Sequence, residues 1–304
     1  MEFLRMLAAV RVPWLDGLMS AVTLLGSEAL LLALALYVFW CRDRRDGYYM
    51  LTVCFSGLVI NQFLKIACRV PRPWVRDPAL TIVESARAGA TGYSFPSGHT
   101  QNITGLMGVV ALTQPRRWLR WLCAAAVALV GFSRMYLGVH TPADVLTSLA
   151  VGLALVFGLR PLMRWAERKP NRMGWLLLGM LGLALAFLGY TQLARFPVEV
   201  DPVNLAEARK NAWTMVGAVA GVGVGWLVDR RADFPRGGVW WAQLLKTAIG
   251  LGLVLGVKEG LKPLLAALFG AAAFTHGIRY FCCVLVATAL WPLSFRFFAR
   301  LGRR

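Results

Sequence analysis

Long apolar segments separated by short, arginine-rich loops constrain this chain more than any other feature. In a helix, about 20 apolar residues cross the hydrocarbon core of a bilayer, and fewer suffice when flanking side chains reach back to the interface. Of the 304 residues, 58% are apolar and only 16% are charged, whereas charged residues make up roughly a quarter of an ordinary soluble domain. The sequence therefore predicts an all-α, polytopic membrane helical bundle. It excludes a disordered chain and a small disulfide scaffold.

About nine segments are predicted as transmembrane helices from their length and apolar character. In chain order they are residues 27–40, 48–68, 99–113, 118–133, 143–159, 173–190, 212–228, 240–257 and 280–295.

Two further apolar stretches are predicted not to cross the bilayer. Residues 3–26 contain Arg5, Arg11 and Asp16, and this mixture favours an amphipathic segment that lies in the interface. Residues 261–274 are too short for a crossing and carry Lys262-Pro263 at their start, which favours a re-entrant or interfacial piece. We expect three regions: an N-terminal interfacial segment (1–26), a membrane core (27–192) and additional C-terminal transmembrane helices (193–304).

The net charge of +18 comes mainly from basic residues in the loops. In a soluble protein this charge would suggest nucleic acid binding, but arginine clusters between apolar runs are typical of loops on the cytoplasmic face. We therefore expect no nucleic acid partner. Because the most basic loops are short and lie on one side, the N-terminus is predicted outside and the C-terminus in the cytoplasm. This topology places residues 69–98 and 134–142 together on the outer face.

The cysteines give no sign of a disulfide framework or a zinc site. They mostly lie in apolar stretches and lack the spacing of either, so we interpret them as small core residues; they are Cys41, Cys54, Cys68, Cys123, Cys282 and Cys283. The sequence also lacks a carboxylate cluster that would hold a hard cation. No metal and no other cofactor is predicted.

Three short segments contain most of the polar residues that are difficult to explain in a membrane. Ionisable groups at membrane depth are costly and usually face one another or a wet cavity, so we expect these segments to converge. They are Lys65-x6-Arg72-Pro73, Pro96-Ser97-Gly98-His99 and Ser133-Arg134-x5-His140-x3-Asp144.

The residue types in these segments suit chemistry on a phosphate. Arginine presents forked donors that match a tetrahedral oxyanion, and Ser97-Gly98 at a helix start exposes backbone N–H groups to a ligand. A histidine can attack phosphorus as neutral imidazole or donate a proton near neutral pH. Asp144 follows His140 by one helical turn and could orient its ring as the acid of a triad does.

The three segments resemble the signature of the type 2 phosphatidic acid phosphatase superfamily, which includes lipid phosphate phosphatases, glucose-6-phosphatase and the vanadium haloperoxidases. Residue types, spacing and order agree at every defining position from Lys65 to Asp144. The resemblance implies a six-helix phosphatase core. Beyond residue 159 it thins, and a total of about nine helices is similar to the glucose-6-phosphatase and sphingoid phosphate phosphatase branches.

The resemblance also implies a role for each matching residue. His140 would attack phosphorus and form a phosphohistidine, Asp144 would orient His140, and His99 would protonate the leaving oxygen and later activate water. The phosphoryl oxygens would be bound by Lys65, Arg72, Ser97, Gly98 and Arg134.

Each motif also has a purely structural interpretation. Thr141-Pro142-x-Asp144 reads as a helix start with a capping box, and Ser97 reads as a helix cap. Lys65 and Arg134 alone would suit interface residues that reach toward water. The agreement of all three segments favours the phosphatase site.

The resulting hypothesis is a metal-independent membrane phosphatase that hydrolyses lipid phosphates such as phosphatidate, polyprenyl diphosphate or a sphingoid phosphate. Its site would face outward from a bacterial inner membrane, or into the lumen of the endoplasmic reticulum in a eukaryote. Two alternatives stay open: a phosphotransferase that passes the phosphoryl group to a lipid or sugar acceptor, and a noncatalytic lipid transporter. The sequence does not specify the substrate or the oligomeric state.

Overall fold

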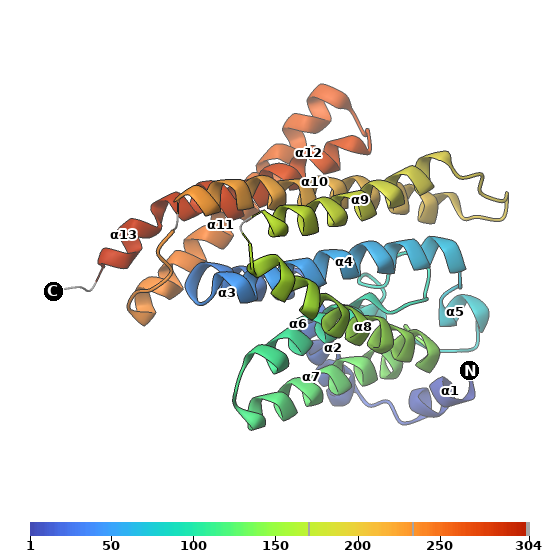
Figure 1. Ribbon diagram of the computed structural model, residues 1–304. Helices are drawn as coiled ribbons and strands as arrows, with labels where there is room; N and C mark the ends of the chain where they lie inside the picture. The colour runs from blue at the N-terminus through green and yellow to red at the C-terminus, as the bar shows by residue number, and fades with distance from the viewer. Residues whose placement is uncertain (170, 233, 302–304) are drawn as a thin grey trace. The chain divides into compact units, whose positions relative to one another are not determined.

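The computed structural model describes residues 1–169, 171–232 and 234–301. This part of the chain consists of helices and connecting segments and contains no strand, which confirms the predicted all-α class (Figure 1). The main helices are α1 (Glu2–Ala9), α2 (Pro13–Thr23), α3 (Glu28–Cys41), α4 (Arg44–Cys68), α5 (Pro73–Arg76), α6 (Gly98–Thr113), α7 (Arg117–Tyr136), α8 (Pro142–Glu167), α9 (Arg172–Leu193), α10 (Pro202–Ala232), α11 (Trp240–Phe269), α12 (Phe274–Leu285) and α13 (Phe295–Arg300). Short helical turns are η1 (Leu24–Gly26), η2 (Glu84–Ala86), η3 (Val286–Leu290) and η4 (Trp291–Ser294).

Every segment predicted to cross the membrane is helical, but fewer than nine meet a strict test of length and apolarity. Within the described residues, 6 helical segments are long and apolar enough to cross, or 7 if α2–η1 and α3 form one span bent by 46°. Helices α3 and α6 have only 14 and 16 residues, which is short for a complete crossing. The chain is a polytopic membrane protein, and a count of nine crossings stays a prediction.

The expectation of a separate piece at residues 261–274 was wrong. Helix α11 continues without a break from Trp240 to Phe269, with Pro263 inside it. A proline removes only one backbone donor, and helices in membranes tolerate this loss because neighbouring groups can satisfy the freed carbonyl. Helix α8 contains Pro161 in the same way.

The chain divides into two compact units that interleave along the sequence. The first, here the motif unit, comprises residues 1–32, 56–160 and 196–208, and the second, here the extension unit, comprises residues 33–55, 161–195 and 209–304. The region boundaries expected from the sequence, after residues 26 and 192, stay a prediction.

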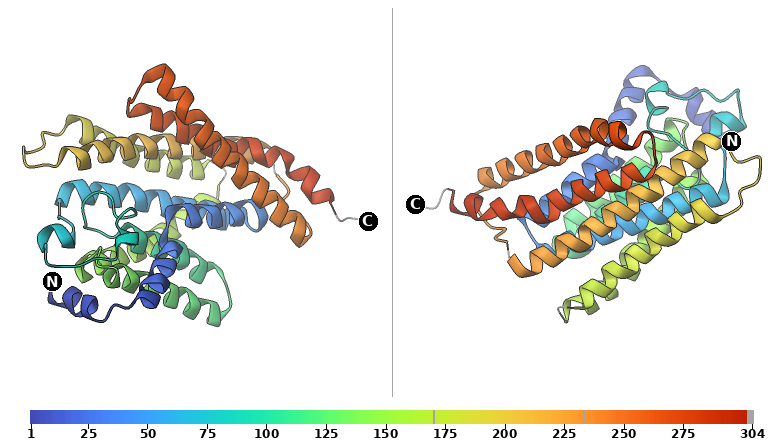
Figure 2. Two further views of the ribbon diagram at one scale, coloured as in Figure 1. Left: turned by 180° about the vertical axis from the view of Figure 1, so that it is seen from behind. Right: turned by 90° about the horizontal axis from the view of Figure 1, so that it is seen from above.

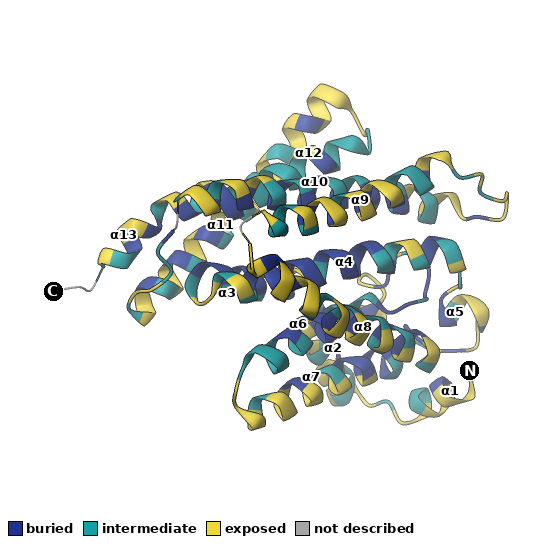
Figure 3. Cartoon of the chain, in the orientation of Figure 1, coloured by how far each residue is buried: buried dark blue, intermediate teal, exposed yellow. Residues whose placement is uncertain are grey.

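In the motif unit, α6 and α7 pack against each other as an antiparallel pair, and α2 and η1 pack onto them. Figure 3 shows that the buried positions of α7 gather toward its C-terminal end. Its exposed apolar side chains, such as Trp118 and Trp121, suit contact with lipid. Gly26 allows η1 to approach α6 closely, because a Cβ at this position would lie 2.9 Å from the carbonyl oxygen of His99.

In the extension unit, α11 packs against α12, η3 and α13, as the views in Figure 2 also show. Gly217, Gly221 and Gly225 of α10 lie directly against α12 and η3, where a side chain would clash. The small residues in this row therefore permit close packing of these helices.

Candidate active site

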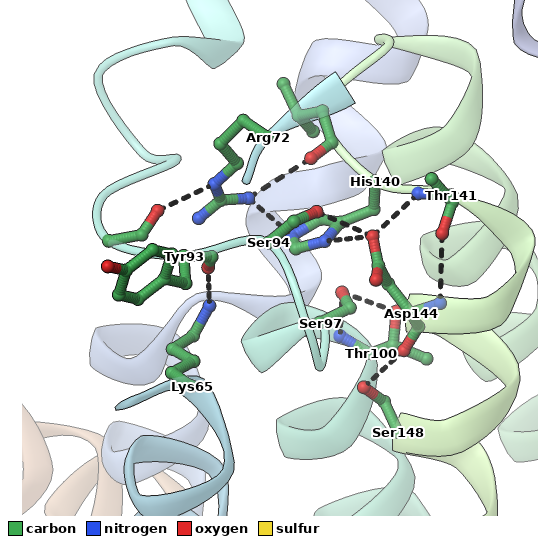
Figure 4. A network of polar contacts seen from close by, with 12 residues as sticks. Lys65, Arg72, Tyr93, Ser94, Ser97, Thr100, His140, Thr141, Asp144 and Ser148 are labelled. Carbon is green, nitrogen blue, oxygen red and sulfur yellow. Dashed lines mark hydrogen bonds and ion pairs between the residues drawn. The ribbon is translucent and has the colours of Figure 1, made fainter. Parts of the chain in front are cut away.

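All three polar segments predicted to converge belong to the motif unit. Each side chain stands at the end of an element. Lys65 is in the last turn of α4, Arg72 precedes α5, Ser97 caps α6, Arg134 is in the last turn of α7, and His140 and Asp144 flank the start of α8. Figure 4 shows Arg72, His140 and Asp144 next to one another, although they come from different parts of the chain.

Arg72 joins the first segment to the third. Its Nε donates to the carbonyl oxygen of Gly92 at 3.0 Å, and its Nη2 donates to that of Thr91 at 2.6 Å. Its Nη1 lies 3.1 Å from the carbonyl oxygen of Val139 and 3.0 Å from Nε2 of His140. The guanidinium is thus held by backbone carbonyls and faces the histidine predicted to be the nucleophile.

The contact with Arg72 decides the tautomer of His140. An arginine only donates hydrogen bonds, so Nε2 must accept through its lone pair and Nδ1 carries the proton. Nδ1 lies 3.4 Å from Oδ2 of Asp144, slightly beyond a well-formed hydrogen bond. Burial, followed by the positive charges of Arg72, Arg134 and Lys65, lowers the pKa of His140 well below its ordinary value. The ring is therefore neutral at physiological pH, as a nucleophile requires.

Asp144 both caps the start of α8 and faces the ring of His140. Its Oδ2 accepts from the backbone N–H of Thr141 at 2.8 Å, while the Thr141 hydroxyl accepts from the backbone N–H of Asp144 at 3.3 Å. This is the capping box read from the sequence. The same Oδ2 accepts a hydrogen bond of 2.6 Å from Ser94 Oγ and faces His140. The capping interpretation is therefore compatible with a catalytic role and does not replace it.

The second segment forms the start of α6. Ser97 caps the helix and accepts from the backbone N–H of Thr100, and its own N–H donates to the carbonyl oxygen of Asp144 at 3.2 Å. The N–H groups of Gly98 and His99 have no acceptor among the hydrogen bonds of the described residues. The first turn of a helix presents such donors to an anion. The half-buried His99 ring follows directly and contributes to the electrostatic field at His140.

Lys65 and Arg134 are buried cations with spare donors. Lys65 Nζ donates to the carbonyl oxygen of Tyr93 at 2.6 Å. Arg134 is 1% exposed, and its Nη1 donates to Oγ1 of Thr23 at 2.9 Å. Its Nε and Nη2 are buried and have no partner within the described chain. Leaving such donors unsatisfied is costly, and a phosphoryl group would supply the missing acceptors.

Three residues of this network were missed by sequence reasoning. Ser94 hydrogen-bonds Asp144, Tyr93 supplies the carbonyl that accepts from Lys65, and Thr23 accepts from Arg134. Ser94 stands only three residues before Ser97, so its position near the second segment was a usable signal. Thr23 lies far away in sequence and carries no motif.

Polar groups of the extension unit that stood outside the motifs are paired locally. Nδ1 of His276 lies 3.1 Å from Nη2 of Arg279. Lys258 lies 3.4 Å from Glu259, as a local pair. Among the described residues, no group of three His, Cys, Asp or Glu side chains is placed to hold a metal ion. Independence from metal stays a prediction.

Comparison with known protein families gives two matches along the chain. Residues 46–168 match the model of the PAP2 superfamily, and residues 213–304 match a model described as PAP2 superfamily phosphatase, transmembrane extension. Phosphatidylglycerophosphatase B of Bacillus subtilis is 34% identical over 161 residues, which cover 49% of this chain and 75% of that protein. The chain belongs to the PAP2 superfamily.

A second relative and one solved structure are also similar to this chain. Undecaprenyl-diphosphatase BcrC of Bacillus subtilis is 33% identical, over 47% of this chain and 72% of its own length. The crystal structure of a transmembrane PAP2 type phosphatidylglycerolphosphate phosphatase from Bacillus subtilis is 30% identical. It covers 53% of this chain and 82% of the solved one, with a TM-score of 0.45. The family matches and the relative that is 34% identical confirm the predicted family.

Proposed function

We propose that this chain is a metal-independent membrane phosphatase that hydrolyses lipid phosphates through a phosphohistidine on His140. One observation carries the proposal. The buried Arg134 has two donors without acceptors, in the same site as the neutral ring of His140. A bound phosphoryl group would satisfy those donors and meet the nucleophile.

Membership of the PAP2 superfamily supports the reaction class. The chain is a phosphatase that acts on lipid phosphates, as its named relatives are. Those names include a phosphatidylglycerophosphatase and an undecaprenyl-diphosphatase. We therefore place phosphatidate-like monoesters and polyprenyl diphosphates first among substrates, followed by sphingoid phosphates.

The first half-reaction breaks the bond between phosphorus and the lipid oxygen. The phosphoryl oxygens take the donors of Arg134 and Lys65 and the backbone N–H groups of Gly98 and His99. Arg72 Nη1 turns from His140 Nε2 to a phosphoryl oxygen, which frees the lone pair of Nε2 for attack. His99 takes up a proton as the anionic phosphoryl group enters the site. A bond then forms between Nε2 and phosphorus, and the leaving alkoxide receives that proton from the His99 imidazolium. Charge on the phosphoryl oxygens is stabilised by preorganised cations.

The second half-reaction restores the enzyme. His99, now neutral, takes a proton from a water molecule, whose oxygen attacks phosphorus and breaks the bond to Nε2. Asp144 faces the Nδ1 proton throughout, so the ring keeps its orientation and its positive charge is stabilised in the intermediate. Inorganic phosphate and the dephosphorylated lipid are the products.

The predicted topology completes the proposal. With the N-terminus outside and the C-terminus in the cytoplasm, the site lies at the outer headgroup level of a bacterial inner membrane. An amphiphilic substrate could reach it from the bilayer, with its phosphate at the basic cluster and its tails among the apolar helices.

The test is phosphate release by the purified protein in detergent with a chelator present. The substrates are phosphatidate, phosphatidylglycerophosphate, undecaprenyl diphosphate, sphingosine phosphate and a sugar phosphate. We expect at least one lipid to be hydrolysed and His140→Ala to lower kcat by about 10⁴-fold or more. His276→Ala is the matched control, because this histidine lies outside the motifs. Full activity of His140→Ala would contradict the mechanism, and phosphate release only with an added acceptor would indicate a phosphotransferase.

A further inference from the structure

The N-terminal segment, residues 1–26, lies outside the matched PAP2 range of 46–168. The sequence predicts it to be a peripheral interfacial piece. In the motif unit, however, α1 and α2 pack against α7, and η1 packs against α6. The segment therefore contacts the elements that carry the candidate active site.

Two arginines of this segment hold the loops on either side of the motif residues. Arg5 pairs with Asp77 at 2.8 Å, five residues after Arg72. Arg11 Nε donates to the carbonyl oxygen of Tyr136 at 2.8 Å, and its Nη1 donates to that of Thr81 at 2.6 Å. These contacts tie the loop after Arg72 to the turn that leads to His140.

The N-terminal segment also contacts the turn that precedes His140. Tyr136 donates its hydroxyl hydrogen to Asp16 at 2.8 Å. Gly138 has a φ of +80°, and a Cβ there would lie 2.8 Å from Nη2 of Arg11. Only glycine accepts this conformation without strain and leaves room for the arginine.

Thr23 makes the most direct contact, because its Oγ1 accepts from Nη1 of Arg134 at 2.9 Å. Both residues are buried, at 7% and 1% exposure. A guanidinium is planar and rigid, so the hydrogen bond at Nη1 restricts the directions in which Nε and Nη2 point. Those two atoms are the buried donors without acceptors.

We propose that residues 1–26 form an N-terminal brace of the active site, in which Thr23 is a positioning residue that aims Arg134 at the phosphoryl group. This inference rests on the proposed function and adds a determinant outside the signature motifs. Thr23 touches neither substrate nor reacting atoms and acts only through Arg134.

The test compares Thr23→Val with Thr23→Ser in the full-length protein. Valine keeps the shape and removes the acceptor, whereas serine keeps the hydroxyl. A lost hydrogen bond to a charged group predicts that Thr23→Val raises KM and the vanadate inhibition constant about tenfold, with a smaller change in kcat. We expect Thr23→Ser to stay within about twofold of wild type on the same grounds. Ser20→Ala is a control on the same helix, because the Ser20 hydroxyl hydrogen-bonds the exposed Ser85 and not Arg134.

A second comparison separates positioning from folding. If Thr23 acts through Arg134, Thr23→Val in an Arg134→Ala background causes no further loss. An unchanged KM in Thr23→Val, or independent losses in the double variant, would overturn the brace.

The brace and the proposed function fail separately. If the wild type hydrolyses a lipid phosphate and Thr23→Val matches it, only the brace is wrong. If the wild type hydrolyses none of the substrates, the proposed function is wrong. Vanadate binding followed by tryptophan fluorescence then still tests the brace, because weaker binding by Thr23→Val supports it and equal binding refutes it.

Discussion

The motif unit and the extension unit both bury charged side chains, but they balance them differently. In the extension unit, the fully buried carboxylate of Asp229 pairs with Arg44 at 2.9 Å and with Arg236 at 2.7 Å, and it accepts from Tyr48 at 3.2 Å. In the described part of the motif unit, three buried cations surround one buried carboxylate in the candidate site, namely Lys65, Arg72 and Arg134 around Asp144.

The difference indicates what each cluster does. Burying an ion is costly, and pairing with hydrogen bonds offsets the cost. The Asp229 cluster satisfies its own charges, so it acts as a cross-link between α4, α10 and the segment before α11. The cluster of Lys65, Arg72, Arg134 and Asp144 carries excess positive charge and includes two donors of Arg134 without acceptors. It is therefore suited to bind an anion.

Among the changes that test this comparison, the largest effect should come from removing one cation of the unbalanced cluster. Arg134→Ala should lower kcat/KM by about 10² to 10³-fold, because it deletes a preorganised donor for the developing charge. Arg134→Lys should recover only part of the loss, since an ammonium lacks the planar fork. Steady-state hydrolysis in detergent measures both. The exposed Arg117 on the same helix is the control. An equal loss of kcat/KM in Arg117→Ala would show that the effect does not depend on the buried cluster.

A smaller effect, on stability instead of rate, should follow from opening the balanced cluster. Asp229→Asn leaves Arg44 and Arg236 without a counter-charge and should lower the free energy of unfolding by about 3 kcal/mol. Titration with a denaturing detergent, followed by circular dichroism, measures this change. The exposed Glu199 supplies the control variant Glu199→Gln. If Asp229→Asn reduced kcat of the folded protein and left its stability intact, the Asp229 cluster would serve catalysis and not act as a structural cross-link.

The smallest effect concerns protonation in the motif unit. An ordinary histidine takes up a proton near pH 6.5, but the lowered pKa of His140 should keep its ring neutral well below that value. The unfolded chain binds this proton and the folded chain does not, so stability should fall as the pH drops below about 6.5. Nitrogen NMR of labelled histidine can follow the ring, because the chain has only 3 histidines and His140→Ala assigns its signal. A midpoint near the ordinary value would show that neither burial nor the cations hold this ring neutral.

The family, the helical class and the motif residues were accessible from the sequence because they depend on local information. Apolar length predicts helices, and the spacing of Lys65, Arg72, His99 and His140 indicates the family without coordinates. The separate piece expected at residues 261–274 was wrong for a related reason. Its short apolar length was interpreted alone, whereas helix α11 continues through Pro263 to Phe269.

The sequence by itself thus determined the family of this chain and the helices that carry its motif residues, since residue type and spacing along one helix or turn decide both. Only the tertiary structure decided which remote groups complete the site. Thr23 meets Arg134 across 111 positions of sequence, and Ser94 meets Asp144 across 50. Such contacts follow from how helices pack, and no periodicity or motif records them.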